Sequence, residues 1–224
     1  MSTPATPRTR SSSQVAKAAK AGQGNRNVWV IVAVVAVVAF AAIIAIALSQ
    51  ESDDGDGGEE TADVTITGDP LPDMTTNPEG AVGMAAPELE GTDLSGESIS
   101  ITNDGRPKVI GFFAHWCPHC QNEVPVIVDW QEAGNQPDDV DFYGVSTNVT
   151  PARENYPPSA WFDEEDWTTP TMKDDGASSA YVSYGAGGFP YWVVVDAEGN
   201  VVTRTSGELG QEQITQLFEQ AAAG

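Results

Sequence analysis

Two cysteines, Cys117 and Cys120, constrain the fold of this 224-residue chain more than any other feature. They are the only cysteines in the sequence, and they stand three positions apart just after the apolar run Val109–Ala114. A Cys-x-x-Cys pair between a buried strand and the start of a helix is typical of redox-active sites in α/β proteins. No further cysteine is available for a structural disulfide framework or a four-cysteine metal site. The pair therefore predicts a single redox centre at a strand-to-helix junction.

A long apolar segment divides the charge of the chain. Residues 1–27 carry a formal charge of +5 and the whole chain carries −23, so the remainder carries −28. Between the two regions lies Val28–Leu48, which is long enough as a helix to cross a hydrocarbon core of roughly 30 Å. Basic flanks of a span stay cytoplasmic. We therefore expect a disordered cytoplasmic tail over 1–27, a transmembrane helix over 28–48 and an extracytoplasmic domain after it.

A cleaved signal peptide is the alternative interpretation, since Ala45-Ile46-Ala47 resembles a small-x-small cleavage site. Both the apolar run and the basic region before it are longer than is usual for such a peptide. Under either interpretation the domain is exported to a compartment where disulfides persist. Its strong negative charge argues against a nucleic-acid partner.

The rest of the sequence predicts an acidic, Gly-rich flexible spacer over 49–80 and one folded domain over 81–224. Hydrophobic patterning and turn residues place the elements of that domain. The expected strands cover 98–101, 109–114, 140–146, 191–196 and 201–205, and the expected helices cover 118–130, part of 151–166, 177–184 and 211–223. This order indicates an α/β fold with a mixed central sheet flanked by helices.

The residues around the cysteines carry a family resemblance. The run Trp116–Cys120, with Glu123 and Pro125 after it, resembles the WCxxCxxExP pattern of membrane-anchored thioredoxin-like proteins of the TlpA/ResA type. Gly83–Pro87 resembles the usual opening of their domain, and Phe189-Pro190 resembles the thioredoxin cis-proline loop. The resemblance covers about residues 80–222. It implies a thioredoxin fold and thiol–disulfide exchange that needs no cofactor and no metal.

Cys117 is the expected nucleophile and Cys120 the expected resolving cysteine. Exchange requires a thiolate, and the N–H groups at a helix N-terminus stabilise negative charge there. Glu123 lies three residues after Cys120 on the same helix face, where a partly buried carboxylate can move the Cys120 proton. Thioredoxins usually place a buried Asp on the preceding strand for this task, and the corresponding position here is Gly111.

The two residues between the cysteines bear on the direction of electron flow. Pro118-His119 is similar to the dipeptide of the strongly oxidising DsbA proteins, and His119 adds a positive charge near Cys117 when protonated. A stabilised thiolate makes the disulfide a better oxidant, so net oxidation is preferred over net reduction. His115 lies outside the dipeptide, and we expect it to be a surface loop residue.

The expected substrate-binding elements are Trp116, Phe189 and Pro190. A cis-Pro190 facing the cysteines would stop strand pairing and leave the Phe189 backbone free for an extended substrate. We expect Gly187-Gly188 to leave room for that substrate, and Trp116 to form a hydrophobic docking surface.

The sequence thus predicts a membrane-tethered extracytoplasmic thiol–disulfide oxidoreductase. Its expected partners are exported protein thiols and disulfides, together with a membrane redox partner. One alternative is a reductase of the same fold serving cytochrome c maturation. An alternative of another class is a copper metallochaperone that uses His115, Cys117, His119 and Cys120 as ligands.

Overall fold

A computed structural model describes residues 60–224 of the chain. Its centre is a five-stranded sheet in the order β6-β5-β4-β7-β8. Strand β4 pairs in parallel with β5 and antiparallel with β7, so the sheet is mixed, as the sequence predicts. The strands are β4 (Lys108–Phe113), β5 (Asp141–Ser146), β6 (Thr171–Lys173), β7 (Tyr191–Val195) and β8 (Val201–Ser206).

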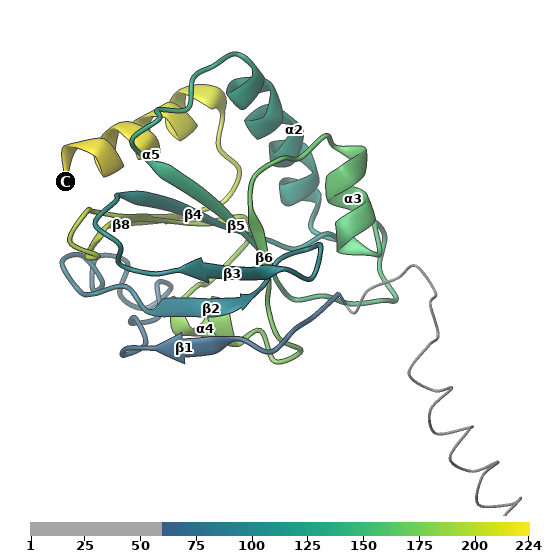
Figure 1. The fold of residues 1–224 in the computed structure, drawn as a ribbon, viewed down its shortest axis with the longest axis horizontal. Helices are drawn as coiled ribbons and strands as arrows, with labels where there is room; N and C mark the ends of the chain where they lie inside the picture. Colours follow the sequence, from purple (N-terminus) through teal and green to yellow (C-terminus); the bar gives the residue numbers. More distant parts are fainter. Residues whose placement is uncertain (1–59) are drawn as a thin grey trace, which may run out of the picture. The chain divides into compact units, whose positions relative to one another are not determined.

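Helices and a second sheet cover the two faces of the central sheet (Figure 1). One face packs against α2, α3 and α5, and the other lies under α4 and an antiparallel sheet of order β1-β2-β3. The helices are α2 (Pro118–Glu132), α3 (Pro158–Glu164), α4 (Ser179–Ser183) and α5 (Gln211–Ala223). The second sheet consists of β1 (Thr65–Thr67), β2 (Glu88–Thr92) and β3 (Ser98–Ile101).

Alternation along β4 explains why both faces need a cover. Val109 and Phe113 belong to the core beneath α2 and α5, whereas Ile110 and Phe112 belong to the core on the opposite face. All six residues of β4 are buried. A strand buried on both faces reads as a continuous apolar run, which is why the sequence identified it.

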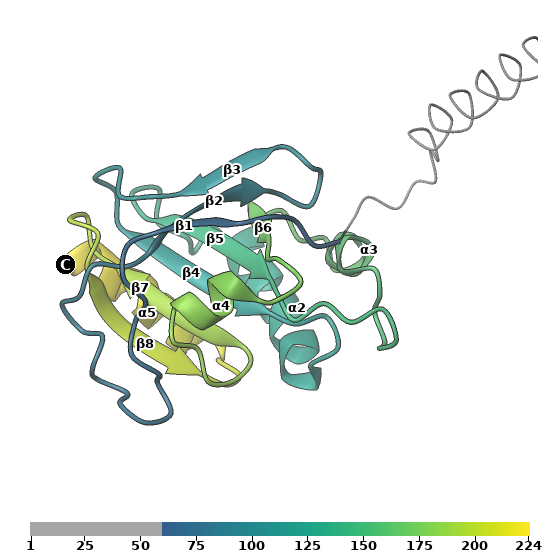
Figure 2. The same cartoon turned by 90° about the horizontal axis from the view of Figure 1, so that it is seen from below.

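The ordered domain begins earlier than the sequence predicts. Residues 60–80, expected to belong to a flexible spacer, include β1 and a segment that runs along α4 and β8 (Figure 2). The buried guanidinium of Arg204 fixes this segment by donating to the carbonyl oxygens of Pro72, Asn77 and Pro78 at 2.7–3.2 Å. A buried charge needs such acceptors, and only the folded chain brings them to Arg204.

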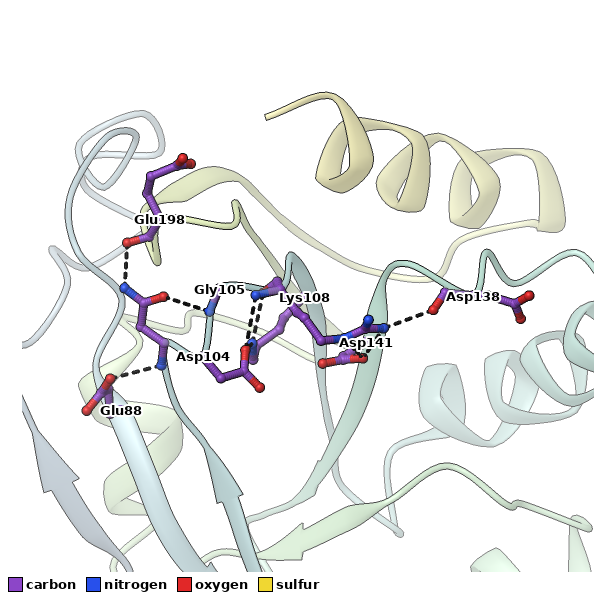
Figure 3. Close-up of polar contacts among 9 residues, drawn as sticks. Glu88, Asp104, Gly105, Lys108, Asp138, Asp141 and Glu198 are labelled. Atoms are coloured by element: carbon purple, nitrogen blue, oxygen red, sulfur yellow. Dashed lines mark hydrogen bonds and ion pairs between the residues drawn. The ribbon is translucent and has the colours of Figure 1, made fainter.

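The N-terminal end of β4 is held by polar contacts at the surface (Figure 3). Lys108 forms an ion pair with Asp104, and Arg106 forms one with Asp141 at 2.8 Å. Asn103 donates to the carbonyl oxygen of Glu198 at 2.7 Å. These contacts fix the end of the sheet that lies away from the cysteines.

The tail, the transmembrane helix and the part of the spacer predicted over residues 1–59 lie outside the described residues. Within residues 60–224, no helix has the length and apolar character needed to cross a membrane.

Candidate active site

The two cysteines occupy the junction between β4 and α2. Cys117 is the N-cap residue of α2, and Pro118 is the first helical residue, where its missing N–H costs no hydrogen bond. Cys117 is 7 % exposed and Cys120 is fully buried, so Cys117 is the more accessible sulfur, as predicted. Both are free thiols in the structure.

Cys120 lies in a site that disfavours its thiolate. Burial raises the pKa of the Cys120 thiol well above its ordinary value, and the nearby Cys117 raises it further. The N–H of Ala114, 3.5 Å from the Cys120 sulfur, opposes this effect only in part. Cys120 therefore holds its proton at neutral pH, and a disulfide can form from it only if another group takes that proton.

Glu123 is the carboxyl that we expected to take this proton. The side chain lies one turn after Cys120 on α2 and is fully buried. Burial raises its pKa to about 8, although Leu209 N–H donates to one carboxylate oxygen at 2.6 Å and Trp192 Nε1 donates to the other at 3.3 Å. The charge of Glu123 also contributes to the raised pKa of Cys120, as expected for neighbouring groups. A carboxyl with a pKa near neutrality is suited to proton transfer.

Gly111 leaves no space for a second carboxylate. A Cβ atom built there would lie 2.7 Å from the Phe113 ring and 3.2 Å from the Trp192 ring. These aromatic rings fill the place that a side chain would need. Glu123 is accordingly the buried carboxylate available beside Cys120.

His119 is exposed at the start of α2 and faces an acidic loop. Its Nδ1 lies 3.0 Å from Glu208 Oε2, and the side-chain amide of Asn122 donates to the same oxygen at 3.3 Å. These contacts lower the pKa of Glu208. No motif in the sequence marks Glu208, which lies 89 residues from His119 along the chain. This contact joins the first turn of α2 to the loop before α5.

His115 is buried, so the expectation of a surface loop residue was wrong. Its Nε2 accepts a hydrogen bond from Thr150 N–H at 3.2 Å, which assigns the ring proton to Nδ1, and Nδ1–H donates to the Glu154 carbonyl at 2.7 Å. Burial lowers the pKa of His115 and keeps the ring neutral. His115 therefore holds the loop 148–156 beside the cysteines.

Trp116 joins that loop to the cis-proline loop. Its Nε1 donates to the Asn148 carbonyl at 2.8 Å, and the Arg153 guanidinium lies 4.8 Å from the ring centre. On the other side its ring lies 6.0 Å from that of Phe189, edge to face. Trp116 is half-buried, so part of its ring surface faces solvent beside Cys117.

The Phe189-Pro190 peptide bond is cis, as predicted. Strand β7 begins one residue later, and no hydrogen bond to the Phe189 backbone is found within residues 60–224. Tyr181 stacks on the Phe189 ring at 4.7 Å. The backbone groups of Phe189 are thus available to an extended peptide, and its ring is supported from behind.

Gly187 and Gly188 make room for the protein itself. A Cβ at Gly187 would lie 2.3 Å from the Thr75 methyl group, and one at Gly188 would lie 2.6 Å from Ser206 Oγ. The prediction that these glycines leave room for substrate was therefore wrong. Their small size lets the segment before β2 and the end of β8 approach the cis-proline loop.

Asp174 is a second buried carboxylate, and it was not among the residues predicted for the site. It accepts hydrogen bonds from Thr147 Oγ1 at 2.7 Å and from the N–H groups of Ala180 and Tyr181 at 2.9 and 3.1 Å. Burial raises its pKa despite these donors. Asp174 orients the start of α4 and thereby Tyr181. An Asp followed by the turn residues 175–178 was the only sequence signal for this role.

The geometry gives little support to a metal site. Both ring nitrogens of His115 are engaged by backbone groups, and His119 points to Glu208. In the part of the chain that the structure describes, no three His, Cys, Asp or Glu side chains are grouped to hold an ion.

A helix-start Cys-x-x-Cys pair next to a cis-proline on a mixed sheet defines a thioredoxin-like thiol–disulfide oxidoreductase. The Redoxin family model matches residues 67–219, and the chain belongs to this family. The expected TlpA/ResA-type resemblance and enzyme class are thereby confirmed.

Two curated relatives agree with this assignment. The thiol:disulfide interchange protein HelX of Rhodobacter capsulatus is 26 % identical over 68 % of this chain and 83 % of its own length. The thiol-disulfide oxidoreductase ResA of Bacillus cereus is 26 % identical over 59 % of this chain and 74 % of its own. The fold is similar to that of a thioredoxin-family thiol:disulfide interchange protein from Chlorobium tepidum, with a TM-score of 0.52, 24 % identity and coverage of 62 % of this chain and 96 % of that one.

Proposed function

We propose that this oxidoreductase is tethered to the membrane, faces the extracytoplasmic side and oxidises the thiols of exported proteins through Cys117 and Cys120. One observation carries the exchange reaction. The accessible sulfur of Cys117 lies at the start of α2, with the unpaired Phe189 backbone in the adjacent cis-proline loop and the buried pair Cys120 and Glu123 behind it.

The reaction starts from the oxidised pair. A substrate thiolate attacks Cys117 Sγ, the bond between Cys117 and Cys120 breaks, and Cys120 leaves as a thiolate that takes a proton from Glu123. A second substrate thiolate then attacks the substrate sulfur of the mixed disulfide, and Cys117 leaves. The substrate gains a disulfide and loses two electrons, which reduce the cysteine pair. A membrane redox partner accepts these electrons and restores the disulfide.

Two features support the oxidising direction. The orphan N–H groups at the start of α2 stabilise the Cys117 thiolate released in the second step. His119 lies in the first turn of α2 with its Nδ1 3.0 Å from Glu208 Oε2, and a protonated imidazole there adds positive charge at the start of the helix. Stabilisation of the reduced form raises the reduction potential by 30 mV for each ~1.4 kcal/mol.

The reduction potential tests the direction. The full chain, purified in a non-ionic detergent, is equilibrated with glutathione buffers, and the fraction of oxidised pair is measured by thiol alkylation and mass spectrometry. We expect a reduction potential of about −120 mV, as for strong oxidants. A potential of about −270 mV would instead assign the protein to the reductants. The variant His119→Gln should have a lower potential, with Gln131→Glu at the far end of α2 as a control that does not.

The topology needs a separate test. The apolar segment Val28–Leu48 after a basic tail supports an N-terminus inside and a domain outside. External protease added to right-side-out membrane vesicles should digest residues 60–224 and leave the N-terminal tail protected. Protection of the domain in intact vesicles, with digestion only after lysis, would contradict this topology.

A further inference from the structure

Positive charge is scarce in the described part of the chain. Residues 60–224 contain 28 acidic side chains and five lysines and arginines, namely Arg106, Lys108, Arg153, Lys173 and Arg204. Arg106 and Lys108 are paired with carboxylates at the far end of the sheet, and Lys173 and Arg204 are buried. Arg153 is the remaining one, and it is exposed.

Arg153 lies at the redox site. Its guanidinium lies over the Trp116 ring, 4.8 Å from the centre, and makes no ion pair or hydrogen bond with a side chain of residues 60–224. The ring of Trp116 in turn contacts that of Phe189. The cation is therefore at one end of a continuous surface that reaches the backbone groups available to a substrate.

The position of Arg153 is fixed by the loop that carries it. Both ring nitrogens of His115 bind backbone groups of this loop, at Thr150 and Glu154 on either side of Arg153. The contact with Trp116 orients the guanidinium further, because a cation over an aromatic face is attracted to it. Less conformational entropy is lost when a partly ordered arginine binds a carboxylate.

We infer that Arg153 is a specificity-determining residue that binds a carboxylate of the substrate polypeptide close to its reacting cysteine. This inference rests on the proposed exchange with protein thiols. The planar guanidinium binds carboxylates through two parallel hydrogen bonds. Arg153 forms no ion pair within residues 60–224, although these residues contain 28 acidic side chains, and this points to an external acidic partner. The other basic side chain at the start of α2, His119, already contacts Glu208 at 3.0 Å.

The test uses three dithiol peptides that differ only beside the reacting cysteine, where they carry Glu, Gln or Lys. Each peptide is mixed in single turnover with the oxidised full chain in non-ionic detergent, and kcat/KM is measured at low and high salt. The acidic protein repels acidic peptides at long range. Comparing two variants of the same net charge removes this effect. Arg153→Gln and Arg106→Gln remove the same charge, but Arg106 lies at the opposite end of β4 and pairs with Asp141.

We expect Arg153→Gln to lower the Glu/Gln ratio of kcat/KM about two- to fivefold, the range for an exposed ion pair. Arg106→Gln should leave the ratio unchanged, and Arg153→Lys should retain part of the preference. The difference should vanish near 1 M salt, where the Debye length is about 3 Å. Equal effects of Arg153→Gln and Arg106→Gln would overturn the role of Arg153. Failure of the wild-type protein to exchange with any peptide would instead refute the proposed function.

Discussion

The carboxyl groups at the two ends of the parallel strands have pKa values shifted in opposite directions. At the N-terminal end, Asp104 is half exposed and pairs with Lys108, which lowers the pKa of Asp104 (Figure 3). At the end that carries the cysteines, Glu123 and Asp174 are buried, and burial raises the pKa of each. The same chemical group is held ionised at one end and retains its proton more strongly at the other.

This difference in carboxyl pKa shows at which end of the strands a side chain can transfer protons near neutral pH. A carboxylate paired with a cation in solvent gains stability from its charge and does not release or take protons near neutral pH. A buried carboxyl with a pKa near 8, such as Glu123, changes its protonation state in the range where thiols react. Ion pairs therefore stabilise the N-terminal end of β4, whereas burial raises the pKa values of the carboxyl groups at the end that carries the cysteines.

The largest expected effect comes from the cysteines. Cys117→Ser should abolish thiol–disulfide exchange, because a serine hydroxyl cannot form the mixed disulfide. Cys120→Ser should keep the nucleophile but accumulate the mixed disulfide with substrate, which mass spectrometry under non-reducing conditions detects. The matched control at the other end of the sheet is Arg106→Gln, which should retain normal exchange. Full activity of Cys117→Ser would contradict the assignment of the nucleophile.

Glu123→Gln should slow disulfide formation in the reduced pair by about ten- to a hundredfold. The upper value is the lower limit of the usual contribution of general acid–base catalysis. In the wild-type protein the rate should rise as pH increases through about 8, because only the carboxylate accepts the Cys120 proton. Stopped-flow measurements of Trp fluorescence between about pH 6 and 10 would give the rate of disulfide formation at each pH. Glu132→Gln, at the exposed end of the same helix, is the control. An unchanged pH profile in Glu123→Gln would show that another group moves the proton.

The stability of the fold should depend on pH through Glu123. Its folded pKa is raised from 4.5 to about 8, so between these values the folded state holds a proton that the unfolded state has lost. The free energy of unfolding should therefore fall as pH rises through this window, by up to about 1.4 kcal/mol per pH unit. Glu123→Gln should remove this slope, giving a gain on the order of a few kcal/mol near pH 8. Urea unfolding at several pH values measures it, and an unchanged slope would contradict the raised pKa.

The smallest expected effect has the opposite sign and belongs to the other end of the sheet. The pKa of Asp104 is lowered, chiefly by Lys108, so its contribution to stability is present above its ordinary pKa and is lost as pH falls through the folded value. Asp104 is half exposed although Lys108 is buried, so solvent screens the pair in part, and Asp104→Asn should cost about 1 kcal/mol at pH 7 and nothing near pH 2. A larger loss at low pH than at pH 7 would be inconsistent with this account.

Local patterns predicted most of the central fold. The apolar run of β4, the helix start at Pro118 and the hairpin of β7 and β8 depend on neighbouring residues, and the structure confirms them. The short strands β1, β2 and β6 were missed. The residues Thr171 and Lys173 of β6 are polar but buried, because pairing with β5 and cover from β2 place them inside.

The predictions for the site also differ according to whether they depend on neighbouring residues or on residues far away along the chain. The positions of Cys117, Cys120 and Glu123 follow from spacing along one helix, and sequence reasoning placed them correctly relative to each other. His115 was misplaced because its burial depends on backbone groups 35 and 39 residues away. Glu208 is brought to His119 by the loop before α5, and no periodic pattern marks that loop.

The contacts of Arg204 decide where the domain can be cut. A shortened protein beginning at Gly83, where the family motif starts, would lack Pro72, Asn77 and Pro78 and leave the Arg204 guanidinium with only Tyr184 and Tyr191 as acceptors. It would also remove Thr75 from beside Gly187 and uncover the back of the cis-proline loop. A fragment for crystallisation or calorimetry should therefore start near residue 60, because residues 60–82, which precede the motif, are part of the folded enzyme.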